Sequence, residues 1–164
     1  MSTTQAWKWH HTGISVTNID RVLDYYAKSL DFQVVFEARN MTDLISSITG
    51  VPGLGAHLVQ TQSPMSDQVL EFIEFFNVPD SYNAMLPLSP GRSHTAYLVD
   101  DIDSATAALV AQGGVMLGQI TTFGEGRAVY CADQNGTVIE LSIKDIGNAL
   151  DISVIDLSFL SNSK

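Results

Sequence analysis

The sequence predicts an α+β fold made of two βαβββ units, and three observations support this prediction. A ten-residue segment occurs twice, as HTGISVTNID at residues 11–20 and as HTAYLVDDID at residues 94–103, about half a chain later. Each copy opens with an alternating run, which is typical of a half-buried strand. Each copy is followed by a helix-like segment and then by further strand-like segments. Duplication of one structural unit explains all three observations.

The predicted elements follow the same order in both halves. Asp20 and Asp103 are predicted to cap the two helices, because a short acidic side chain can bond the free amides of a first turn. The helices are indicated by apolar residues at three- and four-residue spacing, namely Val22, Leu23, Tyr26 and Leu30, and then Ala105, Ala108 and Leu109 before Gly113 and Gly114. The further strands are predicted at 32–38, 57–62, 69–76, 115–121, 127–132 and 137–143, with a short helix at 43–48.

We interpret residues 1–164 as one domain of two modules. Module one covers about 9–78 and module two about 92–143. A segment rich in turn residues, about 79–91, links them. The tail at 144–164 mixes apolar residues with Asp and Ser at no clean period, so an accessory helix on a partner subunit and a partly frayed end both stay open.

Composition and charge exclude several classes of function. With 45% hydrophobic and 16% charged residues, the chain has the composition of a globular protein. Its 18 acidic and 8 basic residues give a net charge of −10, which repels nucleic-acid phosphates and anionic membrane surfaces. The chain has one cysteine, no apolar run long enough to span a bilayer and no signal-peptide pattern. We therefore expect a cytoplasmic protein that acts on a small molecule. We also expect it to form a homodimer.

Strand parity places one histidine of each half on the same kind of face. In the first strand, His11 shares its face with Gly13 and Ser15, while the alternate residues form the side on which the helix packs. His94 holds the equivalent position in the second copy. His10 has the opposite parity and is predicted to lie at the surface or at an edge.

The last strand of each half carries a glutamate of matching parity. Glu140 interrupts an otherwise apolar strand and faces away from the helix-packed side, with Val138 and Ser142. Glu71 is its counterpart in the first half. Two halves brought together would therefore converge two His and two Glu side chains.

Such a set is suited to an octahedral site for one divalent metal ion with two positions left for water or substrate. Burying two carboxylates without a cation would be costly. Zn, Ni, Co, Mn and Fe(II) all accept imidazole and carboxylate ligands, so the metal stays open.

The chain resembles the vicinal oxygen chelate superfamily, which includes glyoxalase I, methylmalonyl-CoA epimerase, extradiol dioxygenases and the bleomycin and fosfomycin resistance proteins. The segments that carry the resemblance are HTGISVTNIDRVLDYYAKSLDF, LEFIEF, HTAYLVDDID and the stretch at 124–141, which ends in YCADQNGTVIEL. The resemblance implies that the two βαβββ modules form an incomplete barrel around a metal site. It also implies that the metal ligands of the family correspond to His11, Glu71, His94 and Glu140 in this sequence.

Within that family, Glu71 favours proton-transfer chemistry, because family dioxygenases keep the matching position free of a ligand. The expected function is a metal-dependent lyase or isomerase of the glyoxalase or epimerase kind. It would act on a small α-oxygenated carbonyl compound or thioester through a metal-stabilised enediolate, with Glu140 or Glu71 as the proton carrier. The chain lacks the basic residue that glyoxalase I carries beside its first histidine, and its segment 39–68 is longer than the epimerase pattern.

Two alternatives remain. The segment at 126–141, with Tyr130, is compatible with an Fe(II)-dependent extradiol-type dioxygenase. A ligand-sequestering protein of the resistance type would use the same fold without turnover.

Tyr130 itself is predicted to pack or line the pocket, or to act as an acid behind the ligands. His57 and Cys131 are predicted to be structural.

Overall fold

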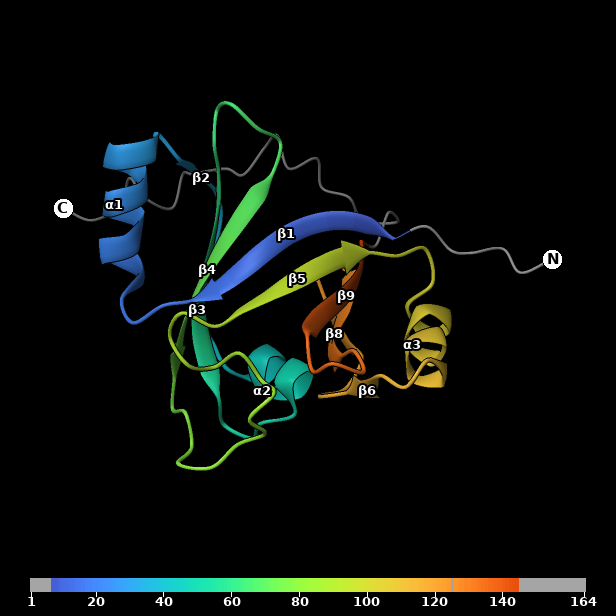
Figure 1. Cartoon of the computed structure of the whole chain (residues 1–164). Helices are drawn as coiled ribbons and strands as arrows, with labels where there is room; N and C mark the ends of the chain where they lie inside the picture. The colour runs from blue at the N-terminus through green and yellow to red at the C-terminus, as the bar shows by residue number, and fades with distance from the viewer. Residues whose placement is uncertain (1–6, 125, 145–164) are drawn as a thin grey trace.

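The computed structural model describes residues 7–124 and 126–144 (Figure 1). It contains three helices and nine strands in that part of the chain. Their order is β1 (Lys8–Ser15), α1 (Ile19–Leu30), β2 (Gln33–Met41), α2 (Asp43–Thr49), β3 (Gly55–Gln62), β4 (Val69–Phe76), β5 (Ser93–Leu98), α3 (Ile102–Ala111), β6 (Val115–Met116), β7 (Thr121–Phe123), β8 (Gly126–Ala132) and β9 (Val138–Lys144). The predicted tail beyond residue 144 lies outside the described residues.

All the strands belong to one curved sheet, which does not close on itself. Its order is β2-β3-β4-β1-β5-β9-β8-β6, and β7 pairs with β8. In each half the first strand runs parallel to the last, β1 with β4 and β5 with β9. The two first strands, β1 and β5, pair antiparallel at the centre of the sheet. The predicted α+β fold with an incomplete barrel is therefore confirmed.

The helices α1 and α3 begin two residues before the positions that the sequence indicated. Asn18 caps α1 by accepting a hydrogen bond from the Arg21 amide, and Asp101 caps α3 by accepting from Asp103 and Ser104. The predicted N-caps, Asp20 and Asp103, are wrong, because both residues lie inside the first turn. They still face the positive end of the helix dipole, which explains why acids are favoured there.

Alternate residues of the strands pack into different cores. On the outer face, Ile14 and Val16 pack with α1, and Ile139 and Ile143 pack with α3, as their parity predicts. On the inner face, which carries Ile73, Tyr130 and Val138, a third cluster includes Ile45 of α2 and two leucines of the segment between the halves. Those leucines, Leu86 and Leu88, are 3% and 4% exposed. The predicted linker is thus a packed part of the inner core.

The predicted strand at 115–121 is interrupted, since the structure has two short strands, β6 and β7, in its place. Between them the chain leaves the sheet to contact α2. The Gln119 amide donates to the Ser47 carbonyl over 3.2 Å, and the hydroxyls of Ser47 and Thr121 lie 2.7 Å apart. These bonds join the second half of the sheet to the helix of the first half.

Gly118 permits this contact, because a Cβ atom at residue 118 would lie 2.1 Å from the Ile48 carbonyl oxygen.

No helix in the described part of the chain is both long and apolar enough to cross a bilayer.

We expect Gly118→Ala to destabilise the protein by about 1–3 kcal/mol, because the added methyl group meets backbone atoms that cannot move aside independently. Urea unfolding followed by circular dichroism measures this change. Gly124→Ala is the matched control, since a Cβ there would meet nothing within 4 Å. Equal unfolding midpoints for the two variants would show that the α2 contact does not need a glycine.

Candidate metal centre

The pairing of four strands brings the predicted histidines and glutamates into two neighbouring rows. In one row, Gly13 of β1 lies between Glu71 of β4 and His94 of β5. In the other row, Ala96 of β5 lies between His11 of β1 and Glu140 of β9. Each row therefore holds one His and one Glu on either side of a small residue. The arrangement is nearly two-fold symmetric about the β1–β5 pair.

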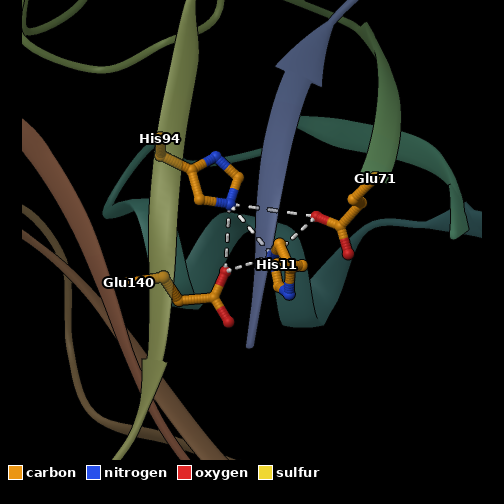
Figure 2. A group of neighbouring side chains, drawn as sticks. All are labelled: His11, Glu71, His94 and Glu140. Carbon is orange, nitrogen blue, oxygen red and sulfur yellow. Dashed lines mark hydrogen bonds and ion pairs between the residues drawn. The ribbon is translucent and has the colours of Figure 1, made fainter. Parts of the chain in front are cut away.

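All four side chains point toward one another on the inner face of the sheet (Figure 2). The Nε2 atoms of His11 and His94 are 3.3 Å apart. His11 Nε2 lies 3.4 Å from Glu71 Oε1, and His94 Nε2 lies 3.4 Å from Glu140 Oε2. The two crossed distances, from His11 to Glu140 and from His94 to Glu71, are both 3.9 Å. The structure thus brings together every residue that the sequence proposed as a metal ligand.

Gly13 provides the room for the His94 ring. A Cβ atom at residue 13 would lie 2.0 Å from Cε1 and 2.6 Å from Nε2 of that ring. No side chain larger than hydrogen fits while His94 keeps this orientation. Ala96, the matching residue of the other row, is fully buried.

Burial and charge act against each other at this cluster. The side chains of His11, Glu71 and His94 are 3% exposed or less, and that of Glu140 is 13% exposed. Burial alone would lower the pKa of His11, but the adjacent Glu71 and Glu140 outweigh it and raise this pKa to about 9. Burial alone would raise the pKa of Glu140, but hydrogen bonding and the charges of both histidines hold it well below its usual range. Without a cation, these shifts favour the charged form of His11 and the carboxylate form of Glu140.

His10 contacts the cluster, contrary to its predicted place at the surface or at an edge. The register of β1 on β5 shifts between Trp9 and His11, so strict alternation fails there. The partly buried His10 ring lies with its Nδ1 atom 2.8 Å from Nδ1 of His11. A neutral His11 whose Nε2 is free to bind a cation carries its proton on Nδ1 and can donate it to His10.

Two further contacts reach the carboxylates from residues that the sequence did not propose for the site. Gln60 of β3 donates from Nε2 to Glu71, and the Ser142 hydroxyl donates to Glu140. Parity alone places Ser142 on the face of Glu140. Gln60 could be found only from the register of β3 on β4, because ten residues separate it from Glu71.

Tyr130, which the sequence predicted to pack, to line the pocket or to act as an acid, lies beside the cluster. Tyr130 belongs to the inner core cluster, and its ring centroid lies 4.9 Å from that of His94. Burial, with the charges of Glu140 and Glu71, raises its pKa well above the usual value, so its phenol is neutral. Its role as an acid in the reaction stays a prediction.

His57 and Cys131 have the structural surroundings that the sequence indicated. His57 accepts a hydrogen bond from the Asn40 amide and lies beside Phe76. Cys131 is fully buried in the outer core, and burial raises its pKa to about 11.

The donor set fits a divalent cation. Donor atoms that are each about 2.1 Å from one ion can be at most about 4.2 Å from one another. Five of the six distances between the four donor atoms, 3.3–3.9 Å, satisfy this limit, and all four atoms lie within 4.8 Å of one another. Imidazole nitrogens and carboxylate oxygens are ligands for several transition metals. The four residues could therefore hold one metal ion.

A family model connects this geometry with known proteins. The model described as "Glyoxalase/Bleomycin resistance protein/Dioxygenase superfamily" matches residues 8–141, which include all four side chains. The chain belongs to this superfamily. Its members typically bind a metal, and in this member the four residues form the cluster that could hold one.

Solved structures show the same fold as this glyoxalase-superfamily chain. A methylmalonyl-CoA epimerase from Mycobacterium tuberculosis is 19% identical, with a TM-score of 0.61 over 88% of this chain and 93% of that chain. A methylmalonyl-CoA epimerase in complex with methylmalonyl-CoA and NH4+ is 17% identical, with a TM-score of 0.58 over 85% and 96%. A hypothetical protein from Bacillus halodurans C-125 is 20% identical, with a TM-score of 0.57 over 85% and 96%. The comparison with curated proteins gives no match.

We expect Gly13→Ala to weaken metal binding at least about 10-fold, because the methyl group displaces the His94 ring from its present position. Competition with a coloured chelator measures the affinity. Ala96→Gly is the matched control in the other row, since it removes a methyl group and obstructs neither histidine. A Gly13→Ala variant that binds metal as tightly as the unaltered protein would contradict the role given to Gly13.

Proposed function

We propose that this protein is a metal-dependent isomerase or lyase that moves a proton at a carbon next to a carbonyl group. The observation that carries the proposal is the buried cluster of His11, Glu71, His94 and Glu140. Its second carboxylate, Glu71, stands where the family's dioxygenases have no ligand. The fold shared with methylmalonyl-CoA epimerases supports an isomerase-type activity in general.

The four side chains would hold one divalent cation, which would polarise the substrate carbonyl and offset the negative charge of an enediolate. Binding at this place requires the two imidazoles to be neutral at Nε2. The Nδ1 contact between His10 and His11 is compatible with that tautomer for His11, with His10 as the acceptor.

Glu140 is the better placed of the two carboxylates to carry the proton. Its side chain is 13% exposed, whereas that of Glu71 is 3% exposed. A general base must come within hydrogen-bond reach of the proton that it removes, so the more accessible carboxylate suits this task. Glu71, whose outer oxygen accepts a hydrogen bond from Gln60, would serve chiefly as a ligand.

The substrate class that we propose is a small α-oxygenated carbonyl compound or a thioester. An acyl-CoA thioester is the first compound to test, because one structural neighbour is a complex with methylmalonyl-CoA. Thiol adducts of 2-oxoaldehydes, which carry adjacent oxygens, are the second.

We expect the protein, purified without added metal, to contain close to one divalent metal ion per chain by elemental analysis. His94→Ala removes a buried donor and should lower that content severalfold. His57→Ala is the matched control, because His57 lies outside the cluster. Metal content that is negligible in the unaltered protein, or unchanged by His94→Ala, would contradict the metal-dependent function and favour ligand sequestration.

We expect Glu140→Gln to lower turnover by about 10²–10⁴-fold while retaining more metal than Glu140→Ala, because the amide keeps an oxygen but cannot accept the proton. Exchange of the substrate α-hydrogen with solvent deuterium, followed by NMR, measures the step directly. Glu37→Gln, at an exposed position of β2, is the control.

Full exchange activity in Glu140→Gln would remove Glu140 from the reaction. Oxygen consumption with a catechol after anaerobic Fe(II) loading, without any proton exchange, would replace the isomerase proposal by a dioxygenase.

A further inference from the structure

The two glutamates of the candidate metal centre use their oxygens unequally. Glu71 directs Oε1 toward His11 and accepts a hydrogen bond at Oε2 from Gln60 Nε2, over 2.8 Å. Glu140 directs Oε2 toward His94 and accepts a hydrogen bond at Oε1 from the Ser142 hydroxyl, over 2.7 Å. In both residues, one oxygen faces the cluster and the other is occupied by a protein donor.

The two donors reach their carboxylates along different paths. Gln60 lies on β3, directly opposite Glu71 in the β3–β4 pair, and β3 contributes none of the four cluster residues. Ser142 lies on β9, two residues beyond Glu140 and on the same face, and it is 9% exposed. Each donor is thus placed by the sheet and not by a loop.

The near two-fold symmetry of the sheet is broken at these contacts. The residue that pairs with Glu140 as Gln60 pairs with Glu71 is Tyr130, whose ring packs in the inner core and against His94. The residue two positions beyond Glu71 is Ile73, which has no hydroxyl. Each half therefore holds its carboxylate by a means that the other half lacks. In both halves one oxygen of the glutamate accepts a hydrogen bond from the protein, although the two donors occupy different positions. This indicates that the hydrogen bond is a requirement of the site and not only a consequence of the duplicated sequence.

A carboxylate with both oxygens free can bind a cation through one oxygen or through both. A hydrogen bond to the outer oxygen lowers the energy of the one-oxygen arrangement and fixes the direction of the inner oxygen. We propose that Gln60 and Ser142 are positioning residues that hold Glu71 and Glu140 as one-oxygen donors. Neither carboxylate then occupies a second position on the cation, which leaves room for the oxygens of the substrate. The inference rests on the metal-dependent function proposed above.

The variants that test this inference remove one donor at a time. Gln60→Leu keeps the approximate size of the side chain without its amide, and Ser142→Ala removes only the hydroxyl. We expect each to weaken metal binding by about 10–100-fold, the usual effect of losing an outer partner of a ligand. Chelator competition with Zn²⁺ and with Co²⁺ measures the affinity.

Two readouts separate positioning from a loss of structure. Infrared difference spectra of the Zn²⁺-loaded protein with ¹³C-labelled glutamate should show the carboxylate bands moving from the one-oxygen to the two-oxygen pattern in each variant. Ser142→Thr keeps a hydroxyl and should restore both the affinity and the bands. Gln62→Leu is the control on β3, since it changes the same residue type two positions away from Gln60.

If Gln60→Leu does not fold, Gln60→Met, which also lacks a donor, tests the same prediction. Folded variants at Gln60 and Ser142 with unchanged affinity and unchanged carboxylate bands would overturn the positioning role and leave the proposed function standing. Absence of Zn²⁺ and Co²⁺ binding in the unaltered protein would overturn both.

Discussion

The antiparallel pairing of β1 with β5 places Gly13 opposite His94 and Ala96 opposite His11. The other features of the candidate centre depend on this register. Because β4 runs beside β1 and β9 beside β5, the same pairing sets Glu71 and Glu140 at the outer ends of the two rows. A shift of one residue would turn the side chains of one strand to the outer face, where the helices pack.

The register places charged groups where water is scarce, and the surrounding contacts compensate for the loss of hydration. Two carboxylates that are nearly buried would each be costly alone. Here each one faces an imidazole on its inner side and accepts a hydrogen bond on its outer side. A divalent cation could satisfy the inner sides of all four residues at once, because imidazole nitrogens and carboxylate oxygens are both ligands for such ions.

The inner face beyond the cluster is filled by parts of both halves. Leu86 and Leu88 of the connecting segment pack there with Ile45 of α2. Bonds from Ser47 of α2 to the chain between β6 and β7 join the first half to the second. A curved sheet that is open at its edges is thus held in shape by packing on the face that carries the candidate centre.

The duplicated segment in the sequence was enough to predict the two βαβββ units, and the family resemblance implied the incomplete barrel. Local alternation predicted the strands that carry the candidate ligands and the shared face of His11, Glu71, His94 and Glu140, because the direction of a side chain in a strand follows from parity. The tertiary structure decided what depends on contacts between distant segments. Only the pairing of β3 with β4 sets Gln60 against Glu71, and only the structure shows that His10, at the register shift after Trp9, contacts His11. The sequence pattern also did not predict the N-caps at Asn18 and Asp101 or the break between β6 and β7. Periodicity is a property of one segment, whereas register, bulges and caps are chosen by the neighbours against which that segment packs.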